Sequence, residues 1–295
     1  MRAPDVSVIM AAYNGERYIE ASIRSILAQT HAALELVVID DGSTDGTWEL
    51  VNALAAADER IVYAFQPNGR QGKARNNGIR RARAPLIAFC DQDDLWVADK
   101  LERQLAALAA ADGVGVLFSD GYLFYDDDVA DERTTFKTMS GTWDGPAMFR
   151  LLFAENRIPV LSSLVRKEAI VRVGMLSEDP VVQNCDDWQL WLRLAADGCR
   201  FLGMPDRLVR YRLHSAQASR DPNVMGRAEI SVLEQFRDSP LLPPGAAARD
   251  LHARYEKLVD GLRRAGLPRE AGEWATRWLR AVGDRSARCA GSTRA

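Results

Sequence analysis

Short apolar runs alternate with helical stripes through residues 5–120, and this alternation restricts the fold more than any other feature of the chain. The apolar runs span residues 6–10, 34–39, 61–65, 86–90 and 114–119. Between them, apolar side chains recur at helical spacing, as Ile19, Ile23 and Ile26 do after the first run. The second run is apolar almost throughout, which is typical of a strand with both faces covered. The pattern predicts an α/β fold with a mostly parallel sheet flanked by helices.

The middle of the chain predicts further elements in a less regular order. Strands are expected at residues 159–165, at Phe201 and at residues 208–211. One helix is expected over residues 148–153 and another from Asp186 onward. The apolar stripe of this second helix is Trp188, Trp191, Leu192 and Ala195.

The character of the sequence changes after about residue 221. Prolines at positions 240, 243 and 244 interrupt the pattern, and two helical stripes follow. The first stripe is Leu251, Tyr255, Leu258, Val259 and Leu262, and the second contains Trp274 and Trp278. We therefore predict a domain of residues 1–222 and a C-terminal helical extension of residues 223–295.

Two acidic turns follow apolar runs of the buried type. Asp40-Asp41 follows the second run, and Asp91-Gln92-Asp93-Asp94 follows the fourth. Clustered carboxylates repel one another and are costly to bury unpaired, so packing alone does not explain them. Hard cations such as Mg2+ or Mn2+ take oxygen ligands and are commonly bound together with phosphate. Because ligands of open α/β sheets bind at the carboxyl ends of the strands, we expect a metal-bound phosphate compound there.

These signals also have structural interpretations. The turn at Asp40-Asp41 can serve to cap the next helix through Ser43 or Thr44. Asp186-Asp187 can simply complement a helix dipole, and His214 can be a structural hydrogen-bonding residue. Most of the basic residues between positions 70 and 83 are expected on a solvated helix face.

Composition places the protein among ordinary soluble globular chains. Of its 295 residues, 47% are hydrophobic and 27% are charged, and the net charge of −3 gives no indication of a nucleic-acid partner. The N-terminus reads as a strand, so we expect no signal peptide. No window reaches the ~20 apolar residues of a membrane-spanning helix. The four cysteines lack metal-type spacing, so free thiols in a reducing cytoplasm are expected.

Five segments together resemble family-2 glycosyltransferases, which are nucleotide-sugar-dependent, inverting enzymes of the glycosyltransferase-A fold. The segments are residues 6–14, 25–30 and 38–45, Ala74-Arg75-Asn76, and Asp91-Gln92-Asp93-Asp94. Each is weak alone, but their order and spacing match the family across about residues 5–215. The form Phe-Cys-Asp-Gln-Asp-Asp-Leu-Trp, with Tyr211-Arg212-Leu213-His214 later, resembles a bacterial branch that includes rhamnosyltransferases of surface polysaccharides.

The resemblance assigns donor-binding roles to six residues. Asp41 would accept a hydrogen bond from the nucleobase imide, and Asp91 would face the ribose or the donor sugar. Basic residues in the preceding loop and helix would approach the nucleotide. The complete set is Ala11, Tyr13, Asp41, Lys73, Arg75 and Asp91.

The resemblance also implies a metal site and a general base. Asp93 would bind Mg2+ or Mn2+, with Asp94 as a neighbouring or alternative ligand and His214 near the diphosphate or the metal. Asp187 would be the general base, with Asp186 beside it. A metal ion stabilises the leaving diphosphate as a Lewis acid, and a carboxylate takes the proton of the attacking hydroxyl.

The predicted function follows from these roles. We expect an inverting, metal-dependent glycosyltransferase that moves a sugar from a UDP- or dTDP-sugar to a glycan or lipid-linked glycan. The reaction would belong to bacterial surface polysaccharide synthesis and would take place in the cytoplasm or at the inner face of the cytoplasmic membrane. Trp274 and Trp278, with Arg277 and Arg280, are expected either to pack against the catalytic domain or to rest on the membrane. The sequence also leaves open that the protein forms a homo-oligomer.

Two other functions stay open at this point. A nucleotidyltransferase also uses an α/β sheet and metal-binding acids, but it typically has a Gly-rich basic loop after the first strand. Residues 11–15 here contain one glycine and no lysine, which counts against it. A non-catalytic nucleotide- or glycan-binding protein of the same fold would have no need of Asp187.

Overall fold

The computed structural model describes residues 3–125, 132, 134–215, 217 and 220–289, without the side chains of residues 282–289. The chain forms two compact units, residues 1–215 and residues 216–295. We call them unit 1 and unit 2.

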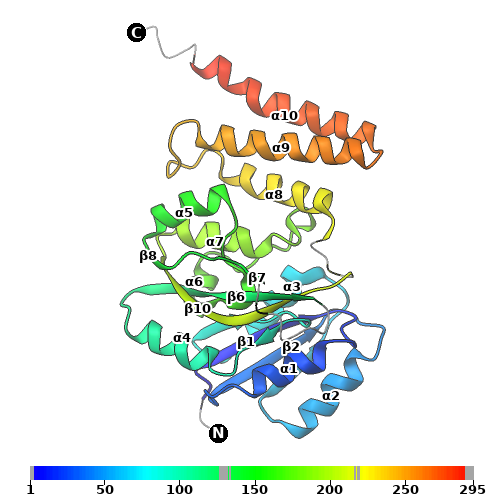
Figure 1. Ribbon diagram of the computed structural model, residues 1–295, viewed down its shortest axis with the longest axis vertical. Coiled ribbons are helices and arrows are strands. Elements are labelled where there is room, and N and C mark those ends of the chain that lie inside the picture. Colours follow the sequence, from blue (N-terminus) through cyan, green and yellow to red (C-terminus); the bar gives the residue numbers. More distant parts are fainter. Residues whose placement is uncertain (1–2, 126–131, 133, 216, 218–219, 290–295) are drawn as a thin grey trace. The chain divides into compact units, whose positions relative to one another are not determined.

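Unit 1 is built on a mixed sheet, with ten strands in the described part of the chain (Figure 1). The strands are β1 (Val6–Ala12), β2 (Leu34–Asp40), β3 (Ile61–Phe65), β4 (Leu86–Phe89), β5 (Leu95–Trp96), β6 (Val114–Tyr125), β7 (Thr134–Thr135), β8 (Gly141–Trp143), β9 (Leu164–Arg166) and β10 (Arg200–Leu213). Their order is β3-β2-β1-β4-β9-β6-β10-β5, with β7 paired to β6 and β8 paired to β10.

The predicted α/β class is confirmed, and the four N-terminal strands of the sheet are parallel. Strands β3, β2, β1 and β4 are parallel neighbours, as are β6 and β10. Strand β9 is antiparallel to both β4 and β6, and β5 is antiparallel to β10. The carboxyl ends of β1 to β4 therefore meet at one edge, where the acidic turns begin.

Helices cover both faces of this sheet (Figure 1). They are α1 (Ile19–Leu27), α2 (Thr47–Ala57), α3 (Arg70–Arg81), α4 (Lys100–Ala109), α5 (Gly145–Ala154), α6 (Lys167–Arg172) and α7 (Asp186–Ala196). Successive side chains of a strand point to opposite faces. Val8 and Met10 of β1 join the buried cluster with Ile23 of α1 and Leu101 of α4. Ile9 points to the other face, where Gly78 lets α3 approach closely.

Three expectations about local structure were wrong. Residues Val160–Ser162 form a 3-10 helix, and of the predicted strand over residues 159–165 only Leu164 and Val165 belong to β9. The two short strands expected near residues 201 and 208–211 form one strand, β10, with register shifts along it. Helix α2 begins after Gly46 without a side-chain cap. Instead, Ser43 Oγ accepts a hydrogen bond from the Asn14 N–H at 3.0 Å.

Unit 2 consists of α8 (Pro222–Phe236), α9 (Ala246–Arg264) and α10 (Pro268–Cys289). The predicted stripe on α9, from Leu251 to Leu262, is buried. The Trp278 ring lies parallel to that of Tyr255, with ring centroids 6.4 Å apart, and the centroid of the Trp274 ring lies 6.0 Å from that of the same tyrosine. Trp274 and Trp278 thus pack within this unit.

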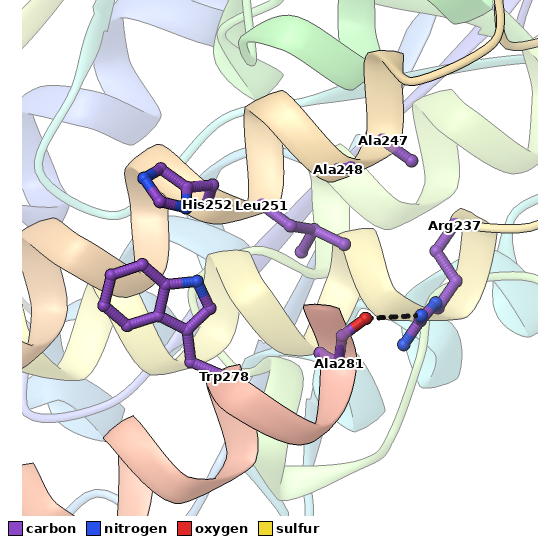
Figure 2. A pocket seen from close by; sticks show the side chains of 7 residues that line it. All are labelled: Arg237, Ala247, Ala248, Leu251, His252, Trp278 and Ala281. Atoms are coloured by element: carbon purple, nitrogen blue, oxygen red, sulfur yellow. Dashed lines mark hydrogen bonds between the residues drawn. The ribbon is translucent and has the colours of Figure 1, made fainter. Parts of the chain in front are cut away.

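A small pocket lies between the helices of unit 2 (Figure 2). His252 meets the Trp278 ring edge to face, with centroids 4.8 Å apart. Arg237 donates to the Ala281 carbonyl at 3.0 Å at the opposite side of the pocket. None of the helices in the described part of the chain is both long and apolar enough to cross a membrane. Cys90, Cys185 and Cys199 are buried free thiols, and the side chain of Cys289 lies outside the described residues.

Candidate active site

Asp41 lies where the ends of three strands meet. Its backbone N–H donates to the Ala12 carbonyl at the end of β1, at 2.7 Å. Its Oδ1 accepts hydrogen bonds from Gln66 Nε2 at 2.6 Å, just after β3, and from the Gly69 N–H at 2.8 Å. Because both donors bond the same oxygen, the rigidly held carboxylate can offer Oδ2 to a ligand.

The neighbouring Asp40 has a structural role. Its Oδ1 accepts from the Ser43 N–H at 2.8 Å, and its Oδ2 accepts from the Tyr63 hydroxyl at 2.9 Å. Burial and the Asp40 carboxylate raise the pKa of Tyr63 well above its usual range. Both oxygens of Asp40 are thus used within the fold, so the two acids of this turn have different roles.

Gln92 joins the acidic turn to the turn that follows β1. Its Oε1 accepts from the Tyr13 N–H at 2.8 Å, and its Nε2 donates to the Tyr13 carbonyl at 3.0 Å. A Cβ at Gly15 would lie 2.4 Å from Gln92 Oε1, so a larger residue there would require the Gln92 amide to shift. Sequence reasoning gave Gln92 no role. It places Tyr13, whose side chain is exposed, beside the acidic turn, while Ala11 pairs with β2 at Ile39.

Asp93 faces His214, which lies 121 residues further along the chain. The Nε2 of His214 is 2.8 Å from Asp93 Oδ2. Strand β10 brings His214 there because Val209 pairs with Trp96 of β5, directly after the acidic turn. Burial and the charge of Asp91 raise the pKa of Asp93, and His214 opposes this rise.

Asp94 is turned toward β10 and is fully buried. Its Oδ1 accepts from the Arg212 N–H at 2.9 Å, and among the described residues its Oδ2 has no hydrogen-bond partner. Burial and the charges of Asp93 and Asp91 raise the pKa of Asp94 well above its usual range. Through Oδ1, Asp94 holds the acidic turn to β10, while Oδ2 is left over for a further partner. The role of Asp94 as a neighbouring or alternative metal ligand stays a prediction.

The residues present suit a divalent cation that is bound mainly through its substrate. Across the described ranges, no group of three or more His, Cys, Asp or Glu side chains is arranged to hold a metal ion. Asp93 and His214 do present one carboxylate oxygen and one imidazole nitrogen at the same place. Mg2+ is usually held by one or two carboxylates, with substrate phosphates and water as its other ligands. A site of two protein ligands therefore fits the expected ion.

Arg75 connects the acidic turn to the start of α7. Its side chain is only 2% exposed; Nη2 lies 2.6 Å from Asp91 Oδ1, and Nη1 lies 3.0 Å from Asp186 Oδ2. Burial disfavours the charged guanidinium, but the nearby carboxylates outweigh burial and raise the pKa of Arg75. In the structure Nη1 and Nη2 of Arg75 each bond one acid, and the predicted approach of Arg75 to the nucleotide stays a prediction. Lys73, on the same helix, is exposed.

Asp187 lies in the first turn of α7, next to Asp186. Its Oδ1 accepts from the Trp188 N–H at 2.7 Å, and its Oδ2 accepts from Asn156 Nδ2 at 3.4 Å. Burial and the charge of Asp186 raise the pKa of Asp187 to about 7, although Arg75 works in the opposite direction. A carboxyl group with a pKa near neutrality can take a proton from a hydroxyl and release it again.

Comparisons with known proteins bear on this geometry. A family model described as glycosyl transferase family 2 matches residues 7–167. An uncharacterized glycosyltransferase of Nostoc sp. is 32% identical over 269 residues, covering 83% of this chain and 78% of the relative. TuaG of Bacillus subtilis, a proposed teichuronic acid biosynthesis glycosyltransferase, is 32% identical over 211 residues, covering 71% of this chain and 79% of TuaG.

Solved structures show the same fold at lower identity. S. aureus TarS 1–349 in complex with UDP-GlcNAc has a TM-score of 0.65 at 18% identity, covering 95% of this chain and 80% of that one. The mannosyltransferase PcManGT of Pyrobaculum calidifontis, in complex with GDP-Man and Mn2+, has a TM-score of 0.64 at 20% identity, covering 97% and 81%. The fold of the chain is therefore of the glycosyltransferase-A type.

Proposed function

The chain belongs to glycosyl transferase family 2, and from this premise we propose that it moves a sugar from a nucleotide-diphospho-sugar to a hydroxyl acceptor with inversion at the anomeric carbon. The observation that carries the proposal is the placement of Arg75. One buried guanidinium joins Asp91, on the donor side, to Asp186, beside the general base. Carboxylates that are distant in sequence are thereby brought together, which supports a shared site for donor and acceptor.

Donor binding uses the strand ends. Asp41 Oδ2 would accept a hydrogen bond from a nucleobase N–H, such as the imide of uracil or thymine. Asp91 would face the ribose or the donor sugar, and Lys73 would contact the diphosphate as a point charge. Asp93 and His214 would hold Mg2+ or Mn2+, which when bound stabilises the negative charge of the leaving diphosphate.

Asp187 serves as the general base in this proposal. The acceptor oxygen forms a bond to the anomeric carbon while the bond from that carbon to the diphosphate oxygen breaks. The hydroxyl proton goes to the Asp187 carboxylate, and the nucleoside diphosphate leaves. With a pKa of about 7, a substantial fraction of Asp187 is ionised at neutral pH, and the group is more basic than an ordinary aspartate.

The biological setting is the finer part of the proposal. The name of TuaG, a teichuronic acid biosynthesis glycosyltransferase, supports a role in bacterial polysaccharide synthesis, and we propose a glycan or a lipid-linked glycan as acceptor. We propose a UDP- or dTDP-sugar as donor, with dTDP-rhamnose among the candidates, and a reaction in the cytoplasm or at the membrane's inner face. The family assignment favours glycosyl transfer over the nucleotidyl transfer considered above.

A donor panel with and without metal tests the proposal. UDP-glucose, UDP-GlcNAc, dTDP-rhamnose and GDP-mannose are each added with Mn2+ or with a chelator, and thermal unfolding is recorded. A true donor at a hundred times its Kd stabilises the folded protein by about 2.7 kcal/mol. We expect the chelator, or Asp93→Ala, to remove most of this gain, because the ion would connect the diphosphate to Asp93.

Turnover with the identified donor then tests the base. Asp187→Asn should lower turnover by about a hundredfold or more while leaving donor affinity nearly unchanged. Asp197→Asn, at the other end of α7, is the matched control. Equal turnover in the two variants would return Asp187 to a capping role. Proton NMR of the product reports the anomeric configuration, and retention would contradict the inverting mechanism.

A further inference from the structure

We propose that Asn156 is a positioning residue for the general base, holding the Asp187 carboxylate in one orientation from a loop that α7 itself anchors. The inference rests on the proposed function, because it concerns the base of that reaction. Asn156 lies in the short connection after α5. No sequence pattern singled it out.

Two tryptophans of α7 anchor both sides of this connection. The indole N–H of Trp188 donates to the Leu152 carbonyl at 2.7 Å, and the indole N–H of Trp191 donates to the Ile158 carbonyl at 3.1 Å. Both indoles are buried, and a buried indole N–H needs an acceptor. The helix that presents Asp187 therefore also fixes the segment that carries Asn156.

The orientation of the Asn156 amide follows from its own loop. Its Oδ1 accepts from the Ile158 N–H at 3.3 Å, in an Asx turn. With the oxygen used in this way, the amide nitrogen is the end that faces Asp187, and Nδ2 lies 3.4 Å from Asp187 Oδ2. The Trp188 N–H bonds the other carboxylate oxygen at 2.7 Å. Each oxygen of Asp187 thus has one donor, and the two donors together define the plane of the carboxylate.

The charged groups around Asp187 show what the amide contributes. Burial and Asp186 raise the pKa of Asp187, while Arg75 from α3, the Trp188 N–H and the Asn156 amide lower it. On the loop itself, Glu155 and Arg157 pair with each other at 2.7 Å. The amide donates a stronger hydrogen bond to the ionised carboxylate than to the neutral acid, so removing it should raise the pKa of Asp187 further.

The first test follows the ionisation of Asp187 without turnover. In the full chain with 13C-labelled aspartate, the carboxyl signal of Asp187 is assigned by its loss in Asp187→Asn and is titrated with pH. We expect Asn156→Ala to move its midpoint upward by about half a pH unit or more. Asn156→Asp has almost the same shape but places a second carboxylate there, and it should move the midpoint further. Arg157→Ala, which removes a neighbouring side chain of the same loop, should leave it unchanged.

The second test is the pH dependence of transfer with the donor found by the panel. A rise of about half a pH unit lowers the ionised fraction by about 2.6-fold near pH 6.5 and by only about 6% near pH 8.5. Turnover of Asn156→Ala should therefore fall mainly on the acid side, with donor affinity within about twofold of the wild type. Arg157→Ala should keep the wild-type profile.

The outcomes separate this inference from the proposed function. An unchanged Asp187 titration in both Asn156 variants, with wild-type melting temperatures, would overturn the positioning role even if Asp187→Asn abolishes transfer. A shifted titration together with full transfer by Asp187→Asn would leave the positioning contact established and refute the assignment of Asp187 as the base.

Discussion

Arg75 balances the charge of the site at the scale of single residues. Three acids lie around its buried guanidinium: Asp91, Asp186 and, at longer range, Asp187. A planar guanidinium can direct separate N–H groups at two carboxylates, whereas a lysine ammonium is a single point of charge. Without this cation, several carboxylates would stay buried together, which is costly. Arg75 therefore sets the relative position of Asp91 and Asp186.

Asp187 itself is predicted to destabilise unit 1 above neutral pH. Its pKa is raised in the folded state from an ordinary value of 3.8 to about 7, mainly by burial and by Asp186. The folded state therefore binds this proton more tightly than the unfolded state. The free energy of unfolding therefore falls as the pH rises from about 4 toward 7, and the whole decrease is present above that range.

The variant Asp187→Asn removes this cost. We expect a gain of about 1–3 kcal/mol in the free energy of unfolding near pH 8.5 and no gain near pH 4. Urea unfolding at the two pH values measures it. The control Asp197→Asn changes an exposed ion pair with Arg172 and should show no such gain. An equal effect of Asp187→Asn at both pH values would contradict the prediction.

At the scale of elements, β10 does most to assemble the site. It pairs with β6 along most of its length, with register shifts near Met204, Arg207 and Val209. Such bulges increase local twist and redirect a strand. They allow the last part of β10 to pair with β5 as well, so that Arg212 meets Asp94 and His214 meets Asp93.

Helix α3 approaches the loop before α7 only because residue 72 is a glycine. A Cβ at Gly72 would lie 2.1 Å from the Ser177 carbonyl oxygen, which is backbone and has little freedom to move. We predict that Gly72→Ala destabilises unit 1 by about 1–3 kcal/mol. Helix propensity alone favours alanine over glycine by about 0.8–1.0 kcal/mol, so the sign of the effect is diagnostic.

Gly272 in α10 provides the matched control, because in the described part of the chain no atom outside its own helix backbone lies within 4 Å of a Cβ built there. Gly272→Ala should stabilise its helix by up to about 1 kcal/mol. Hydrogen exchange measured by mass spectrometry reports each helix separately, so the two units need not unfold together. Faster exchange of α3 in Gly72→Ala and slower exchange of α10 in Gly272→Ala are expected. Slower exchange in both would show that the close approach to Ser177 is unimportant.

At the scale of the whole molecule, unit 2 has a core of its own. Tyr255 is fully buried on α9, its hydroxyl donates to Glu234 of α8, and its ring lies against Trp278 of α10. Arg277 of α10 also pairs with Glu234. All three helices thus converge on one tyrosine, and the tryptophans of α10 serve this packing.

Two adjacent residues of α10 separate packing from membrane binding. Trp278→Ala should destabilise unit 2 by about 2–4 kcal/mol, seen as faster hydrogen exchange of α9. Leu279 is 71% exposed, and Leu279→Ala should change the stability by no more than about 0.5 kcal/mol. Cosedimentation with anionic vesicles completes the test. Loss of vesicle binding by Trp278→Ala, with unchanged exchange of α9, would favour the membrane role.

Local patterns were sufficient to predict the elements in the first half of unit 1 and the acidic residues at the carboxyl ends of its strands. Alternating apolar runs and stripes predicted β1 to β4 and the helices between them, because each element buries its own periodic face. Acids directly after such runs pointed to the strand ends, where Asp41, Asp91 and Asp93 lie. The stripe on α9 was predicted in the same way, and it is buried.

The partners of these residues could not be read from local patterns, because they are distant in the chain. Arg75 and Asp186 are 111 residues apart, and Asp93 and His214 are 121 residues apart. A periodic pattern shows which face of an element is buried, but it does not show what meets that face. Packing therefore occupied Arg75 with two acids, turned Asp94 toward β10 and brought Asn156 to Asp187.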